Sequence, residues 1–357
     1  MKRFVFLTLI ISCFWSCKVQ QIKLKFVDEY ILEDSIEFKN KYIGGLSGID
    51  NDDETYYMVI DDAQDPRVVS GKINIEKDTI SSIEFLDVFS INGKSDFFKN
   101  NYLDLESVFV KDDLMYLTSE GSVNKGKNPA VFSVIKQADL VSEFEFPDCF
   151  KVGSKGSPKH NKLFEASAKS ITGKGFWVGA EGVIGADGVN PNFQENFSPV
   201  RITYYDYQTK KAEKQFAYPL NKLNRKKIGR FNVNGITAML EYEENKFLLV
   251  ERAYQSGYGI NGNTVKIYQV KLNDKTPNTL LIQSLKNKTA FVVKKKLLFD
   301  FDDVRSELAQ KIIDNVEGIT FGPKLSNGNQ SLILVSDDNF QKFGVQLNQF
   351  ILLEMEE

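Results

Sequence analysis

The sequence has few of the residues on which common hydrolytic mechanisms and cross-links depend. Of its 357 residues only three are cysteines and one is a histidine. Cys13 would be lost with an N-terminal signal and Cys17 would be acylated, so Cys149 is left without an intramolecular disulfide partner, and no CxxC metal site is present. The single histidine, His160, excludes mechanisms that need two, including histidine-acid phosphatase chemistry and multi-histidine zinc sites. A serine-hydrolase GxSxG elbow is also absent.

Charge of one sign and long apolar segments are missing as well. The 45 Lys and Arg residues nearly balance the 48 Asp and Glu residues, which argues against a nucleic-acid partner. Beyond the N-terminus, no stretch approaches a membrane-spanning helix in length and apolarity. Because no low-complexity linker divides the chain, we expect residues 22–357 to form one domain, and we expect a monomer.

The first 17 residues, MKRFVFLTLIISCFWSC, predict export. Lys2 and Arg3 precede an apolar run that is short for a bilayer span. Ser16 and Cys17 resemble the cleavage site of bacterial lipoproteins, in which the cysteine becomes the lipidated first residue. We therefore expect a signal peptide over residues 1–16, lipidation of Cys17, an anchor and linker over 17–21, and a lipoprotein of the bacterial cell envelope. Ordinary signal cleavage nearby is the alternative, and it also implies export.

One segment recurs five times along the chain. Each copy contains a short apolar strand, a polar turn and a second strand of good β-formers, which is typical of a β-hairpin. The copies are GGLSGIDNDDETYYMVIDD from Gly44, DLESVFVKDDLMYLTSEGS from Asp104, FEASAKSITGKGFWVGAEG from Phe164, NGITAMLEYEENKFLLVERAY from Asn234 and EGITFGPKLSNGNQSLILVSDDNF from Glu317.

Two further strand-like runs follow each of the first four hairpins, such as RVVSGKINI and SSIEFLDVF after the first. Four antiparallel strands make one blade, so we predict an all-β fold, a single β-propeller. The fifth hairpin is followed by only one strand, NQFILLEM, and we expect the N-terminal strand IKLKFVDEYIL to complete that blade. Five blades are visible, and the long intervals after Phe164 and Asn234 leave room for a sixth. The run DDVRSELAQKIIDN predicts a short helix with Val304, Leu308 and Ile312 on one face.

Acidic residues recur where the hairpins open and close. Because the start of the first strand lies beside the end of the second, these residues must share one end of the blade. If the first strands line the axis, the acids converge on one mouth of the central channel. Glu106 pairs in this way with Glu120, Glu165 with Glu181, and Glu317 with Asp337 and Asp338, whereas Asn234 faces Glu251 and the first repeat closes with Asp61 and Asp62.

Carboxylates gathered in this way cannot all stay ionised and unpaired, so protons, arginines or a hard cation must neutralise them. Oxygen ligands without histidine or thiolate suit calcium best, with magnesium as the second choice. Arg252 directly follows Glu251, and Arg67 lies shortly after Asp62. Either guanidinium could bind a phosphate bidentately or simply balance the adjacent acids. For any single acid, capping of a turn is the structural alternative.

These motifs resemble the phytase-like family, a group of secreted β-propeller proteins described by the esterase-like activity of phytase. The similarity extends from GGLSGID to LNQFILLE. DNVEGITFGPKL, followed by LILVSDDNF and NQF, is similar to the family's Asn-Phe-Glu-Gly and Ser-Asp-Asp-Asn-Phe blocks. NKLFEASA is similar to its Asn-x-Gly-Phe-Glu element, although Leu163 replaces the glycine. The resemblance implies hydrolysis of a phosphoester or carboxylic ester, with matching positions at Glu165, Glu251, Arg252, Glu317, Asp337, Asp338 and Asn339.

We therefore expect a calcium-dependent hydrolase of phosphoesters or related esters that acts at the acidic mouth. The alternative from another class is a noncatalytic cell-envelope propeller that holds a sugar, a peptide or a metal-bound ligand there. An esterase of lactones or similar small molecules is a third possibility. The predicted roles are catalysis for Glu165, Glu317 and Arg252, substrate binding for Arg67, Arg252 and Asn339, and metal binding for Asp61, Asp62, Glu106, Glu120, Glu181, Glu251, Asp337 and Asp338.

Overall fold

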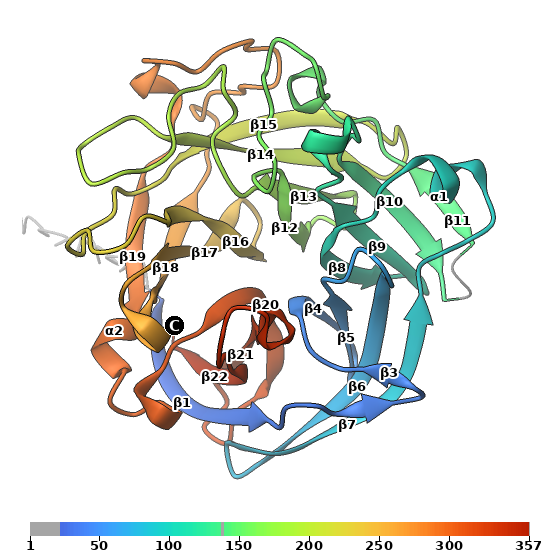
Figure 1. Ribbon diagram of the computed structural model, residues 1–357, viewed down its shortest axis with the longest axis vertical. Helices are drawn as coiled ribbons and strands as arrows, with labels where there is room; N and C mark the ends of the chain where they lie inside the picture. The colour runs from blue at the N-terminus through green and yellow to red at the C-terminus, as the bar shows by residue number, and fades with distance from the viewer. Residues whose placement is uncertain (1–21, 137–138, 357) are drawn as a thin grey trace, which may run out of the picture.

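The computed structural model describes residues 22–136 and 139–356, which form a ring of five four-stranded sheets (Figure 1). Each sheet is one blade, and its strands run antiparallel to their neighbours. The protein is therefore an all-β propeller, as its repeats predict. The expected signal peptide over residues 1–16 and the anchor from Cys17 to residue 21 lie outside the described residues.

Four of the blades are meanders in which the strands follow one another in the chain, and the fifth combines both chain ends. A small hairpin, β2 (Glu37–Phe38) and β3 (Lys41–Tyr42), precedes the first blade. The first blade contains β4 (Leu46–Asp52), β5 (Thr55–Ile60), β6 (Arg67–Glu76) and β7 (Thr79–Ser90), and the second contains β8 (Leu105–Lys111), β9 (Leu114–Ser119), β10 (Ala130–Ile135) and β11 (Leu140–Glu143). The third contains β12 (Phe164–Lys169), β13 (Gly175–Ala180), β14 (Pro199–Asp206) and β15 (Ala212–Pro219), and the fourth contains β16 (Asn232–Glu243), β17 (Lys246–Gln255), β18 (Asn263–Lys271) and β19 (Lys295–Asp300). The fifth contains β20 (Asn315–Lys324), β21 (Gln330–Asp337), β22 (Asn348–Glu356) and β1 (Lys23–Leu32).

The first strand of each blade lines the axis, because β4, β8, β12, β16 and β20 contact one another around the ring. The blades pack face to face, and each of the five interfaces between neighbouring blades has its own hydrophobic core. The interface between the second and third blades is rich in aromatic rings, where Phe176 stacks on Tyr205 with 5.3 Å between ring centroids. Burial of the strands on both faces explains why they are apolar almost throughout.

The N-terminal strand closes the ring. β1 pairs antiparallel with β22, from Lys23 opposite Glu356 to Leu32 opposite Asn348. This pairing covers the outer edge of β22, which would otherwise offer unpaired backbone groups to another chain. The predicted completion of the last blade by the N-terminal strand is confirmed.

The long connections do not form the sixth blade for which the sequence left room. In the described part of the chain the propeller has five blades, the number visible in the repeats. The long intervals after Phe164 and Asn234 contain the connections 181–198, 220–231 and 272–294, whose only regular element is a short 3₁₀ turn.

Helices are few, and the one expected over DDVRSELAQKIIDN is mostly absent. It is limited to α2 (Phe301–Val304) and a 3₁₀ turn, η5 (Ala309–Lys311), in which Gln310 and Lys311 have φ values of 53° and 57°. Such backbone cannot continue a helix. Leu308 and Ile313 pack into the core between the fourth and fifth blades, so tertiary packing overrides the helical period. Within residues 22–136 and 139–356, no helix is long and apolar enough to cross a membrane.

Candidate functional site

Every first strand contains a β-bulge at the same place. In the second blade Leu105 pairs with Ser119 and Ser107 with Thr118, so Glu106 is the extra residue. A bulge interrupts the alternation of a strand and re-aims one side chain. The bulged residues are Ser47, Glu106, Glu165, Thr237 and Glu317, and all five are buried.

The second strand of each blade supplies the residue beside the bulge. Glu120 follows Ser119, and its N–H donates to the carbonyl of Asp104 at 2.9 Å. The registers of the other blades select the equivalent residues, so that opening and closing residues do share one end of each blade. The closing residues are Asp61, Glu120, Glu181, Arg252 and Asp337. We call these five residues and the five bulged residues the carboxylate ring.

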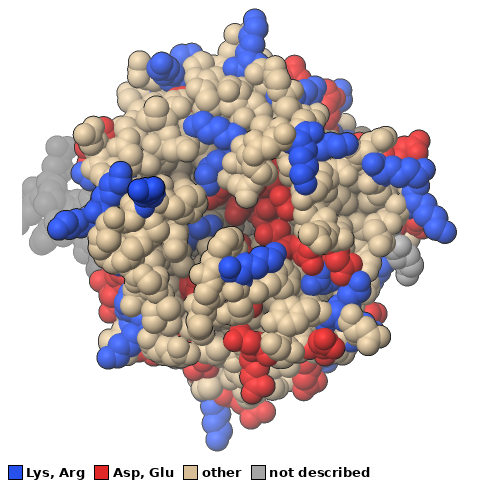
Figure 2. Space-filling view, viewed as in Figure 1, with Lys and Arg blue, Asp and Glu red and all other residues tan. Residues whose placement is uncertain are grey.

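Two groups of three carboxylates lie close enough to share a cation. Oxygen atoms of Asp61, Asp104 and Glu106 lie within 4.8 Å of one another, and so do those of Glu106, Glu120 and Glu165. Glu106 belongs to both groups. Figure 2 shows acidic side chains gathered in the hollow at the centre of this face. Asp104 was not among the predicted ligands, although its place as the first residue of the second repeat could have indicated it.

Burial and mutual repulsion raise the pKa values of these carboxyl groups. Desolvation raises the pKa of Glu106 well above its usual value, and the charges of Asp61 and Glu165 raise it further. Burial, aided by Asp104, raises the pKa of Asp61 to about 8. Burial, aided by Glu181, raises that of Glu120 to about 8. Such groups retain protons near neutral pH unless a cation takes the place of the protons.

The fourth blade contributes an arginine where the other blades contribute an acid. Arg252 Nη2 donates to Glu317 Oε1 at 3.0 Å, and the arginine side chain is only 12% exposed. Gly235, which pairs with Arg252, leaves room for the neighbouring acid, since a Cβ atom there would lie 2.6 Å from Cγ of Glu181. Burial raises the pKa of Glu317 and Arg252 lowers it, with a resulting value of about 7. The carboxylates of the first three blades thus crowd together, whereas Glu317 has a guanidinium partner.

The structure does not bring Glu251 into the ring. Glu251 and Arg252 are consecutive on β17, so their side chains point to opposite faces. The Glu251 carboxylate accepts hydrogen bonds from Tyr218 at 2.8 Å, the Asn221 N–H at 2.9 Å, Asn234 at 2.7 Å and Lys295 at 2.5 Å. Asn234 does face Glu251, as predicted, but neither residue belongs to the ring, because the register of β16 and β17 places Thr237 and Arg252 at those positions.

Arg67 and Asp62 pair with each other at the edge of the ring. Arg67 is 2% exposed and donates to Asp62 Oδ2 at 3.0 Å and to the carbonyls of Asp65 and Tyr42 at 2.7 and 2.8 Å. All these partners belong to the protein itself. The structure thus favours the interpretation that Arg67 neutralises the charge of the adjacent acids.

Asp338 and Asn339 form the turn after β21. Asp338 accepts hydrogen bonds from the N–H groups of Gly45 at 2.7 Å and Phe340 at 3.1 Å. The N–H of Asn339 donates to Asp337 Oδ1 at 2.6 Å. Asp338 therefore caps a turn and ties the last blade to the first, while Asn339 orients the ring residue Asp337.

Basic side chains lie beside several carboxylates of the ring and of its edge. Lys162 forms an ion pair with Glu181. The charges of His160, Lys125 and Lys342 oppose the burial that raises the pKa of Asp104. An acidic centre with a basic surround can hold both a metal ion and an anion bound to it.

The model of one protein family matches most of the chain. This family is phytase-like, described as "Esterase-like activity of phytase", and the match covers residues 41–340. The chain belongs to the phytase-like family. The matched part of this phytase-like protein runs from β3 into η6 (Asn339–Gln341) and includes every residue of the carboxylate ring. A comparison with curated protein sequences gives no match.

Several solved structures are similar in architecture at low sequence identity. The α-L-arabinanase of Cellvibrio cellulosa is 9% identical with a TM-score of 0.45, over 86% of this chain and 91% of that chain. The catalytic domain of the Coprinopsis cinerea GH62 α-L-arabinofuranosidase is 9% identical with a TM-score of 0.43, over 93% and 97%. An exo-1,5-α-L-arabinanase from a bovine ruminal metagenomic library is 8% identical with a TM-score of 0.40, over 87% and 93%.

Proposed function

We propose that this phytase-like protein is an exported, calcium-dependent hydrolase of phosphoesters or related esters that acts at the carboxylate ring. The observation that carries the proposal is the convergence of buried and half-buried carboxylates from three blades beside a guanidinium from a fourth that is 12% exposed. A structural acid such as Glu251 is surrounded by hydrogen-bond donors, whereas the charges acting on Glu106 come from other carboxylates. Such crowding is costly to the fold, and a bound cation would offset it.

The donor set suits a hard divalent cation. All candidate ligands are carboxylate oxygens, and Ca²⁺ takes roughly six to eight oxygens at about 2.3–2.6 Å. Ligands on opposite sides of such an ion are up to about 5 Å apart, which is compatible with the 4.8 Å limit within each group. Magnesium is the second choice because it needs a tighter octahedron. Asp61, Asp104, Glu106, Glu120 and Glu165 would hold the ion, which would bind a phosphate and polarise a water molecule.

Arg252 and Glu317 provide complementary chemistry beside that site. A guanidinium can bind two phosphate oxygens and stabilise the charge that develops during hydrolysis. A carboxyl group with a pKa of about 7 can hold or release a proton near neutral pH, as a general acid or base must. Because the two side chains are paired at 3.0 Å, a bound anion would compete with Glu317 for Arg252.

Hydrolysis of phosphomonoesters and phosphodiesters such as p-nitrophenyl phosphate and bis-p-nitrophenyl phosphate is expected to require calcium. Activity should fall to background with a chelator and return when calcium is added. Glu317→Gln keeps the shape but cannot exchange the proton, so kcat should fall about 10²–10⁴-fold. Glu354→Gln is the matched control, because Glu354 is buried at the opposite end of the fifth blade and accepts hydrogen bonds from Asn327 and Asn329. It should retain wild-type activity.

Hydrolysis that neither the chelator nor Glu317→Gln affects would contradict the proposal. Calcium binding without turnover of any ester would instead assign the mouth to a noncatalytic ligand-binding propeller.

We also propose that the protein works outside the cytoplasm as a lipid-anchored monomer of the cell envelope. The support is the basic pair, the apolar run and Cys17 at the N-terminus. Labelling with a radioactive fatty acid, lost in Cys17→Ser, tests the anchor.

A further inference from the structure

Two loop segments of the fourth blade form a basic surface beside the carboxylate ring. Residues 222–231 precede β16, residues 254–262 lie at the end of β17, and together we call them the lip. β16 starts and β17 ends at the mouth, so the lip lies on the same face as the ring. The lip contains no Asp or Glu, in a chain whose net charge is −3. Its five cations are Lys222, Arg225, Lys226, Lys227 and Arg230.

Hydrogen bonds hold the two segments of the lip together. The Gly229 N–H donates to the Ser256 carbonyl at 2.9 Å, and the Ser256 N–H donates to the Phe231 carbonyl at 2.9 Å. Tyr258 donates to the Lys226 carbonyl at 2.7 Å, and its ring carries the Arg225 guanidinium at 3.7 Å from the centroid. The lip is therefore a hydrogen-bonded double loop with a defined shape.

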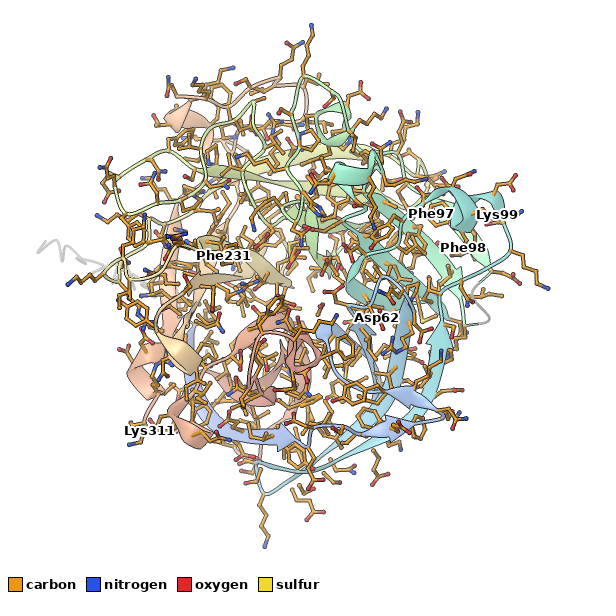
Figure 3. All side chains as sticks on the ribbon, in the orientation of Figure 1. Asp62, Phe97, Phe98, Lys99, Phe231 and Lys311 are labelled. Carbon is orange, nitrogen blue, oxygen red and sulfur yellow. The ribbon has the colours of Figure 1, made fainter. Side chains whose placement is uncertain are left out.

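Large apolar side chains of the lip project into solvent. Ile228 is 58%, Phe231 61% and Ile260 50% exposed. Phe231 lies over the fourth blade in the view of Figure 3. The connections that follow the second strands of the third and fifth blades add Val189, Phe343 and Val345 to the same face. Six of the eleven exposed large apolar side chains in the described residues thus surround the mouth, and clusters of this kind mark interaction surfaces.

We propose that the lip docks the mouth of the propeller on a lipid surface with anionic headgroups. In the run KKIGRF, Lys226 and Lys227 precede Ile228, and Arg230 precedes Phe231. Each apolar side chain that enters the headgroup region therefore brings a cation to the level of the phosphates. Among the lip cations, Lys222 alone forms an ion pair with a described residue, Glu195, at 2.5 Å. A soluble polyanion would need the cations but would leave the exposed isoleucines without a partner.

Docking in this orientation narrows the class of substrate. The carboxylate ring lies between the lip and the other mouth loops, so it would face the membrane surface. This step rests on the proposed function, and it identifies the substrate as a phosphoester carried by a lipid headgroup. The surface itself is independent of turnover and is tested without it.

A tryptophan reporter tests the docking in the full chain. Phe231→Trp places an indole at the lip, whereas the native Trp177 is 1% exposed, and Trp15 of the expected signal peptide is equally present in the wild-type protein against which the shift is measured. Vesicles of phosphatidylglycerol with phosphatidylcholine should shift the emission of Phe231→Trp to the blue relative to the wild-type protein, whereas phosphatidylcholine alone should not. Ile171→Trp is the matched control, because Ile171 is 52% exposed in the turn after β12, at the opposite end of a blade. Its emission should stay unchanged.

The charges are tested by a triple substitution with a matched control. Lys226→Gln, Lys227→Gln and Arg230→Gln together should weaken vesicle binding on the order of a hundredfold, since each cation near an anionic surface contributes about fivefold. The control is the triple replacement of Lys77, Lys174 and Lys324 by glutamine. These three exposed lysines lie at the β6–β7, β12–β13 and β20–β21 turns, at the ends of the blades away from the mouth, and their loss should leave binding unchanged.

Three results would overturn the proposal: no blue shift with anionic vesicles, an equal shift in Ile171→Trp, or an equal shift with a soluble anionic polysaccharide. The last would assign the lip to a polyanion. Hydrolysis of water-soluble phosphoesters without vesicle docking would contradict the lip assignment and leave the proposed function standing. Docking without hydrolysis of any ester would do the reverse.

Discussion

Glu106→Gln is expected to remove calcium binding at the carboxylate ring and to stabilise the metal-free protein. Glu106 is the carboxylate that both groups of three share. The amide keeps the size of the side chain but removes a buried carboxyl group whose ionisation is opposed by burial and by the neighbouring carboxylates. Calcium affinity depends on the number of charged ligands, so it should fall at least about a hundredfold. In the presence of chelator near pH 8, the free energy of unfolding should rise by about 1–3 kcal/mol.

Isothermal titration with calcium and denaturant unfolding in chelator measure the two effects. Glu354→Gln, the same change at a buried glutamate far from the ring, should leave calcium affinity unaltered. If Glu106→Gln bound calcium as tightly as the wild-type protein, the shared carboxylate would not be a ligand. If it destabilised the metal-free protein, the repulsion inferred from the crowding would be wrong.

Arg252→Gln is expected to lower both activity and stability. The guanidinium is the buried partner of Glu317, and its charge also acts on Glu181 and Glu165. Its removal leaves a buried carboxylate unpaired, which costs about 3 kcal/mol or more. The loss of a group that stabilises developing charge should reduce kcat about 10²–10³-fold. Denaturant unfolding and steady-state kinetics measure the two losses separately.

The double variant Arg252→Gln/Glu317→Gln separates the two roles of the arginine. Because both charges are then absent, stability should recover most of what the single variant lost, whereas activity should not recover. Equal destabilisation in the single and double variants would contradict the ion pair as the source of the stability loss. Recovery of activity together with stability would contradict a role for Arg252 in catalysis.

The architecture could be predicted because each repeat carries its own hairpin signal. A strand, a polar turn and a second strand are local features, and the unpaired strands at the two chain ends have only each other as partners. The failed helix over DDVRSELAQKIIDN shows the limit of local signals. Its apolar spacing suits a helix, but burial of Leu308 and Ile313 against two blades decided the backbone instead.

The sequence predicted where the site lies, but it predicted only some of the residues that form it. Acids at the hairpin ends had to share the mouth, and Glu106, Glu120 and Glu165 do gather there. The fourth blade was mispredicted because NGIT at Asn234 looks like EGIT at Glu317, whereas the strand pairing places the bulge three residues later at Thr237 and the closing position at Arg252. The side chain of Glu251 therefore points away from the ring, and the side chain of Arg252 points into it. In ITAM, Thr237 takes the place that glutamate has in three other blades.

The central claim is that the ring carboxylates retain protons when no metal is bound and exchange them for calcium. Because burial raises the pKa of Asp61 and Glu120 to about 8, above that of an unfolded chain, the folded state binds more protons over this range. Stability of the metal-free protein is then greatest below the unfolded pKa and is lost as pH rises through the folded pKa.

The most direct test is the thermal unfolding midpoint from about pH 5 to about pH 8, with chelator and with calcium. In chelator the midpoint should fall by about 5 °C or more as pH rises. Calcium at about a hundred times its dissociation constant should restore about 2.7 kcal/mol near pH 8 and much less near pH 5. Sodium chloride at the same ionic strength should not reproduce this effect. A midpoint in chelator that stays constant or rises over this range, or a midpoint near pH 8 that calcium leaves unchanged, would contradict the account.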